Sequence, residues 1–64
     1  MDDYWVFYVG GQRDRWLISE KSINQLERGA RFIPVHDPDD ERRPYVLNTD
    51  HVLTVSAVME GDKL

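Results

Sequence analysis

The residues from Tyr4 to Val9 constrain the fold most strongly, because all six are aromatic or β-branched. Residues of these types favour β-strands, in which successive side chains point to opposite faces. Tyr4 and Tyr8 would share one face with Val6, and Trp5 would share the other with Phe7, so neither face is polar. We therefore expect this strand to be covered on both sides, or to present its second face to another subunit.

The small size of the chain supports the same expectation. Its 64 residues and 7.6 kDa allow a single domain, 1–64, with an ordered part from about 4 to 59 and a frayed tail at 60–64. A domain of this size buries little apolar surface, and the absence of cysteine excludes disulfides. We expect the chain to gain stability by forming a homo-oligomer or by binding a partner protein.

The formal net charge of −4 narrows the choice of partners. Nucleic acids and anionic membrane surfaces select for excess positive charge, so we expect neither to bind this chain. We also expect no signal peptide and no membrane span, because no apolar run approaches the length that a bilayer requires. The absence of cysteine fits a reducing compartment, and the predicted location is the cytoplasm.

The first half of the chain predicts a hairpin followed by a short helix. Gly10 and Gly11 can adopt the positive φ values of a tight turn, and a second strand follows at about 13–19. Either Ser19 or Ser22 can cap the next helix. That helix has about two turns, an apolar stripe and a glycine at its end; these residues are Ile23, Leu26, Ala30 and Gly29.

The second half predicts three further strands. Residues 31–36 form the first, which Pro34 places at a sheet edge or at a bulge because proline lacks a backbone donor. An exposed loop is predicted at 37–44, a short strand at 45–47, a turn at 48–50 and a last strand at about 51–59. The result is an α+β fold of order ββαβββ with a mainly antiparallel sheet. A five-stranded small barrel of the SH3 or Sm-like kind is the alternative.

None of the usual catalytic motifs is present, so we expect no enzymatic activity. His36 and His51 each neighbour an aspartate, but their spacing selects no metal geometry. The acidic residues between Asp37 and Glu41 lack the glycine and glutamate pattern of a calcium loop. We therefore expect no catalytic residue, no metal site and no cofactor.

The arginines suggest one ligand-binding site. A planar guanidinium can bind phosphate through two hydrogen bonds, and Arg13 and Arg15 point the same way from one predicted strand. A nearby ring could stack on a base, and polar groups after the fourth strand could read its edges. The candidate ligand-binding residues are Arg13, Arg15, Trp16, Asn48, Thr49 and His51. Surface ion pairing to the twelve acidic side chains is the simpler explanation of the same arginines.

The aromatic residues suggest an interface. Seven large rings exceed what one small core hides, so one or two should anchor a contact with another chain. The candidate interface residues are Tyr4, Trp5, Tyr8 and Pro34.

Through the hairpin that ends at Trp16–Ser19, the short helix, and residues 31–35 and 45–55, the chain resembles, over about residues 4–58, a group of small phage and prophage accessory proteins. In these, a turn with the pattern tyrosine-x-x-asparagine-threonine-x-histidine-valine precedes the last strand. Here the pattern runs from Tyr45 to Val52, after Trp16–Ser19 and Arg31–Val35. The resemblance implies a non-enzymatic protein that inhibits a host factor, or an oligomer that sequesters a phosphorylated signalling nucleotide as counter-defence.

Two function classes follow from these observations. The first is an interaction module that forms homo-oligomers or binds a partner protein, for which the acidic charge and the two-faced first strand are the main arguments. The second is capture of a phosphorylated nucleotide between subunits. A nucleic-acid-binding small barrel is the third alternative, and the charge of −4 disfavours it.

Overall fold

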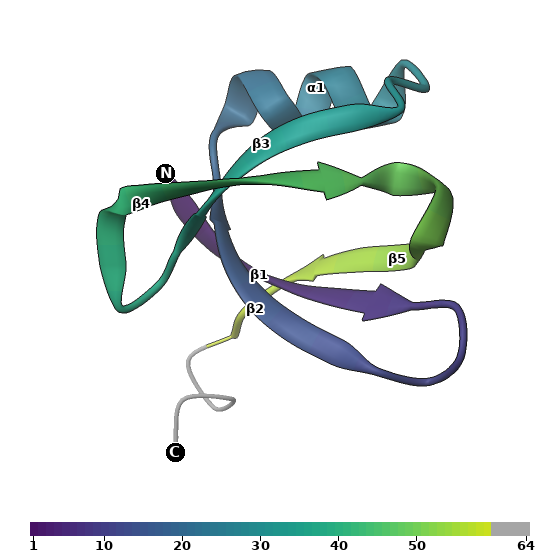
Figure 1. Ribbon diagram of the computed structural model, residues 1–64, viewed down its shortest axis with the longest axis horizontal. Helices are drawn as coiled ribbons and strands as arrows, with labels where there is room; N and C mark the ends of the chain where they lie inside the picture. The colour runs from purple at the N-terminus through teal and green to yellow at the C-terminus, as the bar shows by residue number, and fades with distance from the viewer. Residues whose placement is uncertain (60–64) are drawn as a thin grey trace.

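The computed structural model describes residues 1–59, and the tail expected at 60–64 lies outside the described residues. Along this part of the chain the elements are β1 (Asp2–Tyr8), β2 (Arg13–Ile18), α1 (Glu20–Glu27), β3 (Phe32–Asp37), β4 (Asp40–Asn48), the 3-10 turn η1 (Thr49–His51) and β5 (Val52–Ala57). This order of strands and helix confirms the predicted α+β, ββαβββ fold (Figure 1).

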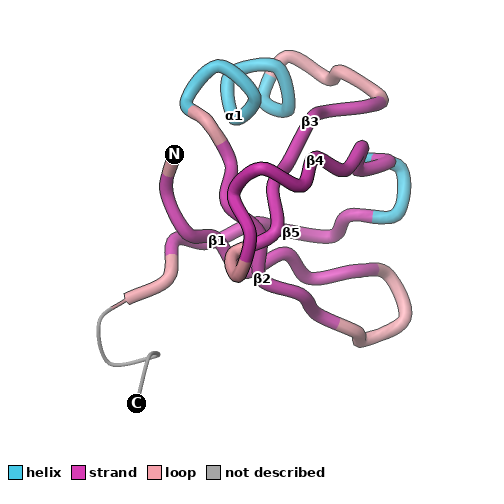
Figure 2. Tube along the Cα trace, turned by 60° about the vertical axis from the view of Figure 1, so that its left-hand side comes forward, coloured by secondary structure: helices cyan, strands magenta, loops and turns pink. Residues whose placement is uncertain are grey.

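The strands form one antiparallel sheet in the order β4-β3-β2-β1-β5. Between β2 and β3 the pairing is limited to Leu17 opposite His36, and at this narrow junction the sheet bends. As a result β3 and β4 lie across from β1 and β5, with α1 at one end (Figures 1 and 2). The bend resembles that of the small barrel considered as the alternative. In the described residues, however, β4 and β5 do not pair, so the barrel is not closed.

A small core fills the space inside the bend. Among residues 1–59 the buried apolar side chains are Val6, Ile18, Ile33, Val35 and Leu47. The apolar stripe of α1 packs against them, which confirms the role predicted for Ile23, Leu26 and Ala30. We call the side of the sheet that faces these residues the core side, and the opposite side the outer side.

The local signals at the turns and the helix behave as expected. Gly10 and Gly11 have φ values of 108° and 92°, and Gly29 ends the helix region with a φ of 86°. Ser19 is the N-cap, since its hydroxyl oxygen accepts a hydrogen bond from the Ser22 backbone N–H at 3.1 Å. Of the two capping serines left open by the sequence, Ser22 instead lies inside the helix, where it is 2% exposed.

The predicted loop at 37–44 is wrong. Only a tight turn at Pro38 and Asp39 separates the strands, and β4 begins at Asp40. The proline at position 44 belongs to a strand because of where its nitrogen points. The Thr49 N–H donates to the Arg31 carbonyl, and in an antiparallel ladder only alternate residues face a given neighbour. Pro44 is five residues from Thr49, so its nitrogen faces the free edge of β4, where no donor is needed.

The same alternation corrects the prediction for Pro34. β3 is an interior strand of the sheet, not an edge strand. Pro34 is three residues from Arg31, so its nitrogen faces β2 and not β4. Because β2 has stopped pairing with β3 at this point, the missing donor leaves no gap in the ladder.

The strand β5 contains an irregularity that exposes an apolar side chain. Phe7 pairs with Thr54 and Tyr8 pairs with Val52, so Leu53 has no partner on β1. The extra residue in this bulge is 71% exposed, whereas Val52 and Val55 pack against the core.

The N-cap gives the first testable prediction. We expect Ser19→Ala to lower the free energy of unfolding by about 1 kcal/mol, because the Ser22 N–H loses its acceptor. Ser19→Asp, which keeps a capping oxygen, should retain most of the wild-type free energy of unfolding. Urea denaturation measures both, with the exposed Ser56→Ala as control. Equal stability of Ser19→Ala and Ser56→Ala would contradict the assignment of the cap.

Candidate functional site

The six candidate ligand-binding residues lie in three different places. Arg13 and Arg15 are on the outer side of β2, opposite Phe7 and Trp5 of β1. Trp16, the next residue along β2, is on the core side. Asn48, Thr49 and His51 lie at the connection from β4 to β5.

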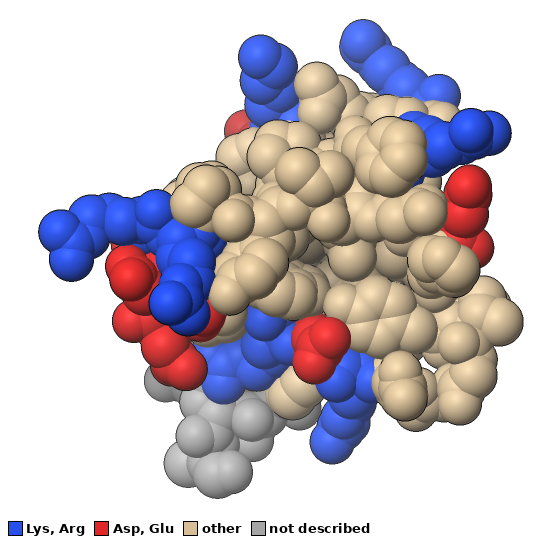
Figure 3. Space-filling model, viewed as in Figure 1, with Lys and Arg blue, Asp and Glu red and all other residues tan. Residues whose placement is uncertain are grey.

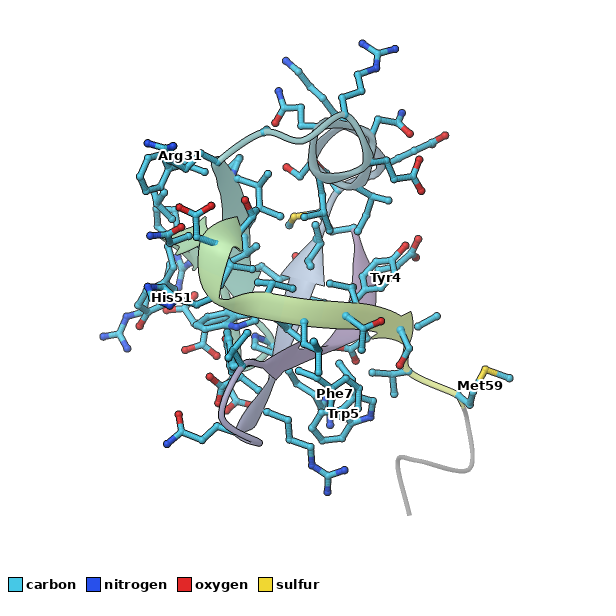
Figure 4. The ribbon with its side chains drawn as sticks, turned by 90° about the vertical axis from the view of Figure 1, so that its right-hand side faces the viewer. Tyr4, Trp5, Phe7, Arg31, His51 and Met59 are labelled. Atoms are coloured by element: carbon cyan, nitrogen blue, oxygen red, sulfur yellow. The ribbon has the colours of Figure 1, made fainter. Side chains whose placement is uncertain are left out.

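The two arginines are already engaged by neighbours on the outer side. The Arg13 guanidinium carbon lies 4.7 Å from the centre of the Trp5 ring, and that of Arg15 lies 6.0 Å away. Arg15 also forms an ion pair of 2.8 Å with Asp3. We call these four residues the Trp5 cluster. It is a cation–π arrangement, and the ring beside the arginines is Trp5 and not Trp16 as predicted. Figure 4 shows Trp5 beside Phe7 on this side of β1.

The Trp5 cluster leaves two polar atoms without partners. Asp3 Oδ1 and Arg15 Nε are buried and make no hydrogen bond. The Asp3 and Arg15 side chains as a whole are 21% and 35% exposed, so the ion pair between them is partly screened by solvent. The cluster therefore holds one guanidinium neutralised by a carboxylate, and a second one stacked on an indole.

Trp16 belongs to an aromatic cluster on the core side. Its indole N–H donates to the Tyr8 hydroxyl oxygen at 3.0 Å, and its ring lies 5.0 Å from that of Tyr45 at an angle of 55°. Beside it lies an open cleft of about 420 Å³, lined by Asp14, Arg15, Trp16, Asp37, Pro38 and Asp39. The indole is thus held by packing and a hydrogen bond, on the side of the sheet away from the Trp5 cluster.

Tyr8 has a perturbed acidity in this cluster. Burial raises the pKa of Tyr8 above its ordinary value of 10.0, and the neighbouring Asp14 carboxylate raises it further, whereas the hydrogen bond from Trp16 lowers it. The folded protein therefore binds the phenolic proton more tightly than the unfolded chain does.

This raised pKa predicts a loss of stability at alkaline pH. The contribution is fully present below about pH 10 and is lost as the pH rises through the pKa of folded Tyr8. We expect the free energy of unfolding, measured with urea, to fall from about pH 10 upward, as the pH passes through the raised pKa of folded Tyr8. Tyr8→Phe should reduce that fall, and Tyr4→Phe, which keeps the Tyr8 hydroxyl, should not. An unchanged slope in Tyr8→Phe would contradict the argument.

The side chains of Asn48 and Thr49 form hydrogen bonds to the backbone of the same chain. The Asn48 side-chain oxygen accepts a hydrogen bond from the Asp50 N–H and so caps η1. The Thr49 hydroxyl lies 2.6 Å from the Ala30 carbonyl oxygen and 3.0 Å from that of Arg31. These bonds join η1 to the segment between α1 and β3. Both residues are therefore occupied structurally.

The Thr49 hydroxyl gives a prediction that separates structure from ligand binding. We expect Thr49→Val to lower the free energy of unfolding by about 1–3 kcal/mol, because the Ala30 carbonyl loses the hydroxyl donor, whereas the Arg31 carbonyl keeps the Thr49 backbone N–H. The same replacement at the exposed Thr54 should change it by less than about 0.5 kcal/mol. If the two variants unfold at the same urea concentration, Thr49 has no structural role.

The structure also does not bring the four candidate interface residues together, and it leaves His51 at the surface. His51 is exposed, and its carbonyl accepts a hydrogen bond from the Val9 N–H at 2.9 Å. Tyr4 and Tyr8 pack on the core side, so of the four predicted interface residues only Trp5 and Pro34 face outward. These two lie on different strands, β1 and β3.

The outer side of β3 and β4 carries an apolar surface of which the sequence analysis predicted only Pro34. Pro34 lies opposite Val46, and Phe32 and Pro44 point to the same side at alternate positions. All four are exposed, Val46 by 72% and Phe32 by 56%. We call Phe32, Pro34, Pro44 and Val46 the hairpin face. The sequence signal for this surface was the pair of apolar residues at alternate positions 44 and 46. It was missed because residue 44 was assigned to a loop.

Charged side chains surround the hairpin face. Figure 3 shows a broad uncharged area over β4, with Lys, Arg, Asp and Glu side chains along its margins. At one end Arg31 and Asp50 form an exposed ion pair of 3.6 Å, and at the other Arg42 lies 3.8 Å from Asp40. An uncharged apolar centre with a polar margin is the arrangement found in protein–protein interfaces.

Comparison of the chain with protein-family models, curated proteins and solved structures finds no match. Within residues 1–59, no helix is long and apolar enough to cross a bilayer. In the same part of the chain, no group of three or more His, Cys, Asp or Glu side chains is arranged to hold a metal ion. The case for a function therefore rests on the surfaces described above.

Proposed function

We propose that this protein is a non-enzymatic interaction module that acts by binding a protein through the hairpin face. The observation that carries the proposal is the contiguous set of four exposed apolar residues on the outer side of β3 and β4. Isolated exposed apolar residues are common, but a strip of adjacent ones with a charged margin is typical of a docking surface.

The chemistry of the hairpin face favours a protein over other partners. Two prolines, a valine and a phenylalanine present apolar area that a partner can bury, but their side chains form no hydrogen bonds to phosphate or sugar. The net charge of −4 also disfavours nucleic acid. The free edge of β4 is a weak template for an added strand, because Pro44 turns its nitrogen toward that edge. Side-chain packing, and not strand addition, is therefore the proposed mode of binding.

Capture of a phosphorylated nucleotide has less support as the alternative function. Its six candidate residues lie in three places of one chain, and Asn48 and Thr49 already serve η1. The resemblance to phage and prophage accessory proteins adds a further element to the proposal, namely that an interaction module of this kind inhibits a host factor.

Site-specific photo-crosslinking tests the proposal. A benzophenone amino acid placed at position 46, in cells that produce the protein, should form adducts with protein, because position 46 is in the centre of the hairpin face. The same group at the exposed position 24 of α1 is the matched control. Adding Phe32→Asp to the position-46 protein should remove most of the adduct, since a charge in the face costs binding energy. Adducts of equal yield at positions 24 and 46 would refute the proposal.

A further inference from the structure

The hairpin face lies on one of the two broad sides of a flat molecule. The extents of the chain are 32 × 27 × 17 Å, and Figures 1 and 3 are viewed along the shortest of them. An ellipse with the two longer extents, which outlines the whole molecule and not the hairpin face alone, covers roughly 700 Å²; each partner in a stable protein–protein interface buries roughly 800 Å². A partner of the same size as this chain could therefore cover the whole side.

The two ends of the hairpin face carry opposite charge. The turn end, residues 37–43, has four carboxylates and two arginines, Arg42 and Arg43, which gives a formal charge of −2. The other end, residues 28–32 with 48–51, has Arg28, Arg31 and one carboxylate, Asp50, which gives +1. The ion pairs within each end are exposed, with Arg31 72% and Arg42 95% accessible, so they stabilise the monomer little and can exchange partners.

We infer that a second copy of this chain occupies the hairpin face, in a symmetric dimer with antiparallel β4 strands. A two-fold axis in the plane of the face, perpendicular to β4, places the acidic turn end of each copy against the basic end of the other. The opposite orientation would bring −2 against −2 and +1 against +1. The inference rests on the proposed function and names the partner.

The apolar centre of the hairpin face is also compatible with a second copy of the chain. In a two-fold interface each patch meets itself, so the patch must be self-complementary. The hairpin face carries no charge, so two copies with a net charge of −4 each can meet there without placing like charges in contact. Their own ends then supply the unlike charges at the margin.

Complementary charge reversal tests the dimer and its orientation. The first variant, Asp39→Lys with Glu41→Lys, makes the turn end +2, and the second, Arg28→Glu with Arg31→Glu, makes the other end −3. Each variant alone should dimerise on the order of 10-fold more weakly than the wild type, because both of its contacts join like charges. An equimolar mixture should form a heterodimer, since both contacts then join unlike charges. Sedimentation velocity over a range of concentrations measures all three.

Two controls separate charge at the face from net charge and from folding. Asp2→Lys with Glu20→Lys changes the net charge by the same amount as the first variant, but at the start of β1 and of α1, and should leave the dimer unchanged. Circular dichroism should show that every variant is folded. Val46→Asp should abolish the dimer.

The outcomes are distinguishable. Wild-type protein that sediments as 7.6 kDa up to millimolar concentration would overturn the inference, and a position-46 adduct with a different protein would then still support the proposed function. Reversed variants that dimerise as tightly as the wild type would overturn the antiparallel orientation and with it the inference. A first variant that dimerises more weakly than the wild type, together with a heterodimer in the mixture, would confirm it, because in the opposite orientation the first variant would dimerise as tightly as the wild type.

Discussion

Five buried side chains from four strands form the apolar centre on which the described structure depends. Val6 comes from β1, Ile18 from β2, Ile33 and Val35 from β3, and Leu47 from β4. A flat sheet would place these residues too far apart to touch, so the sheet bends at the short junction between β2 and β3. The bend buries the core side, and α1 covers the open end.

The same bend divides the outer side of the sheet into two solvent-facing surfaces, one on β1 and β2 and the other on β3 and β4. On β1 and β2 the chain's own arginines cover Trp5, because the guanidinium groups of Arg13 and Arg15 both lie over its ring. On β3 and β4 no comparable cover exists among the described residues, so the hairpin face stays exposed. The two surfaces of the outer side thus differ in accessibility. The surface on β1 and β2 is partly covered by side chains of the same chain, and the hairpin face is accessible to a partner.

Much of the fold was predictable because its signals are local. The pair of Gly10 and Gly11, the Ser19 cap and the stripe of Ile23 and Leu26 depend on residues within a few positions of one another. The loop predicted at 37–44 failed because Pro44 is compatible with a strand only when its nitrogen faces an unpaired edge. The candidate site failed to assemble for a related reason. Alternation along β2 sends Arg15 and Trp16 to opposite sides, and only the sheet decides what each side meets.

The sequence by itself determined the order of the elements, the small size of the core and the excess of apolar and aromatic side chains over what that core can hold. These follow from composition and from spacing along one chain. Only the tertiary structure decided which of the excess residues remain exposed, because that depends on strand register and on where the sheet bends. Leu47 and Val46 are neighbours in sequence, yet pairing of β4 with β3 buries the first and leaves the second in solvent.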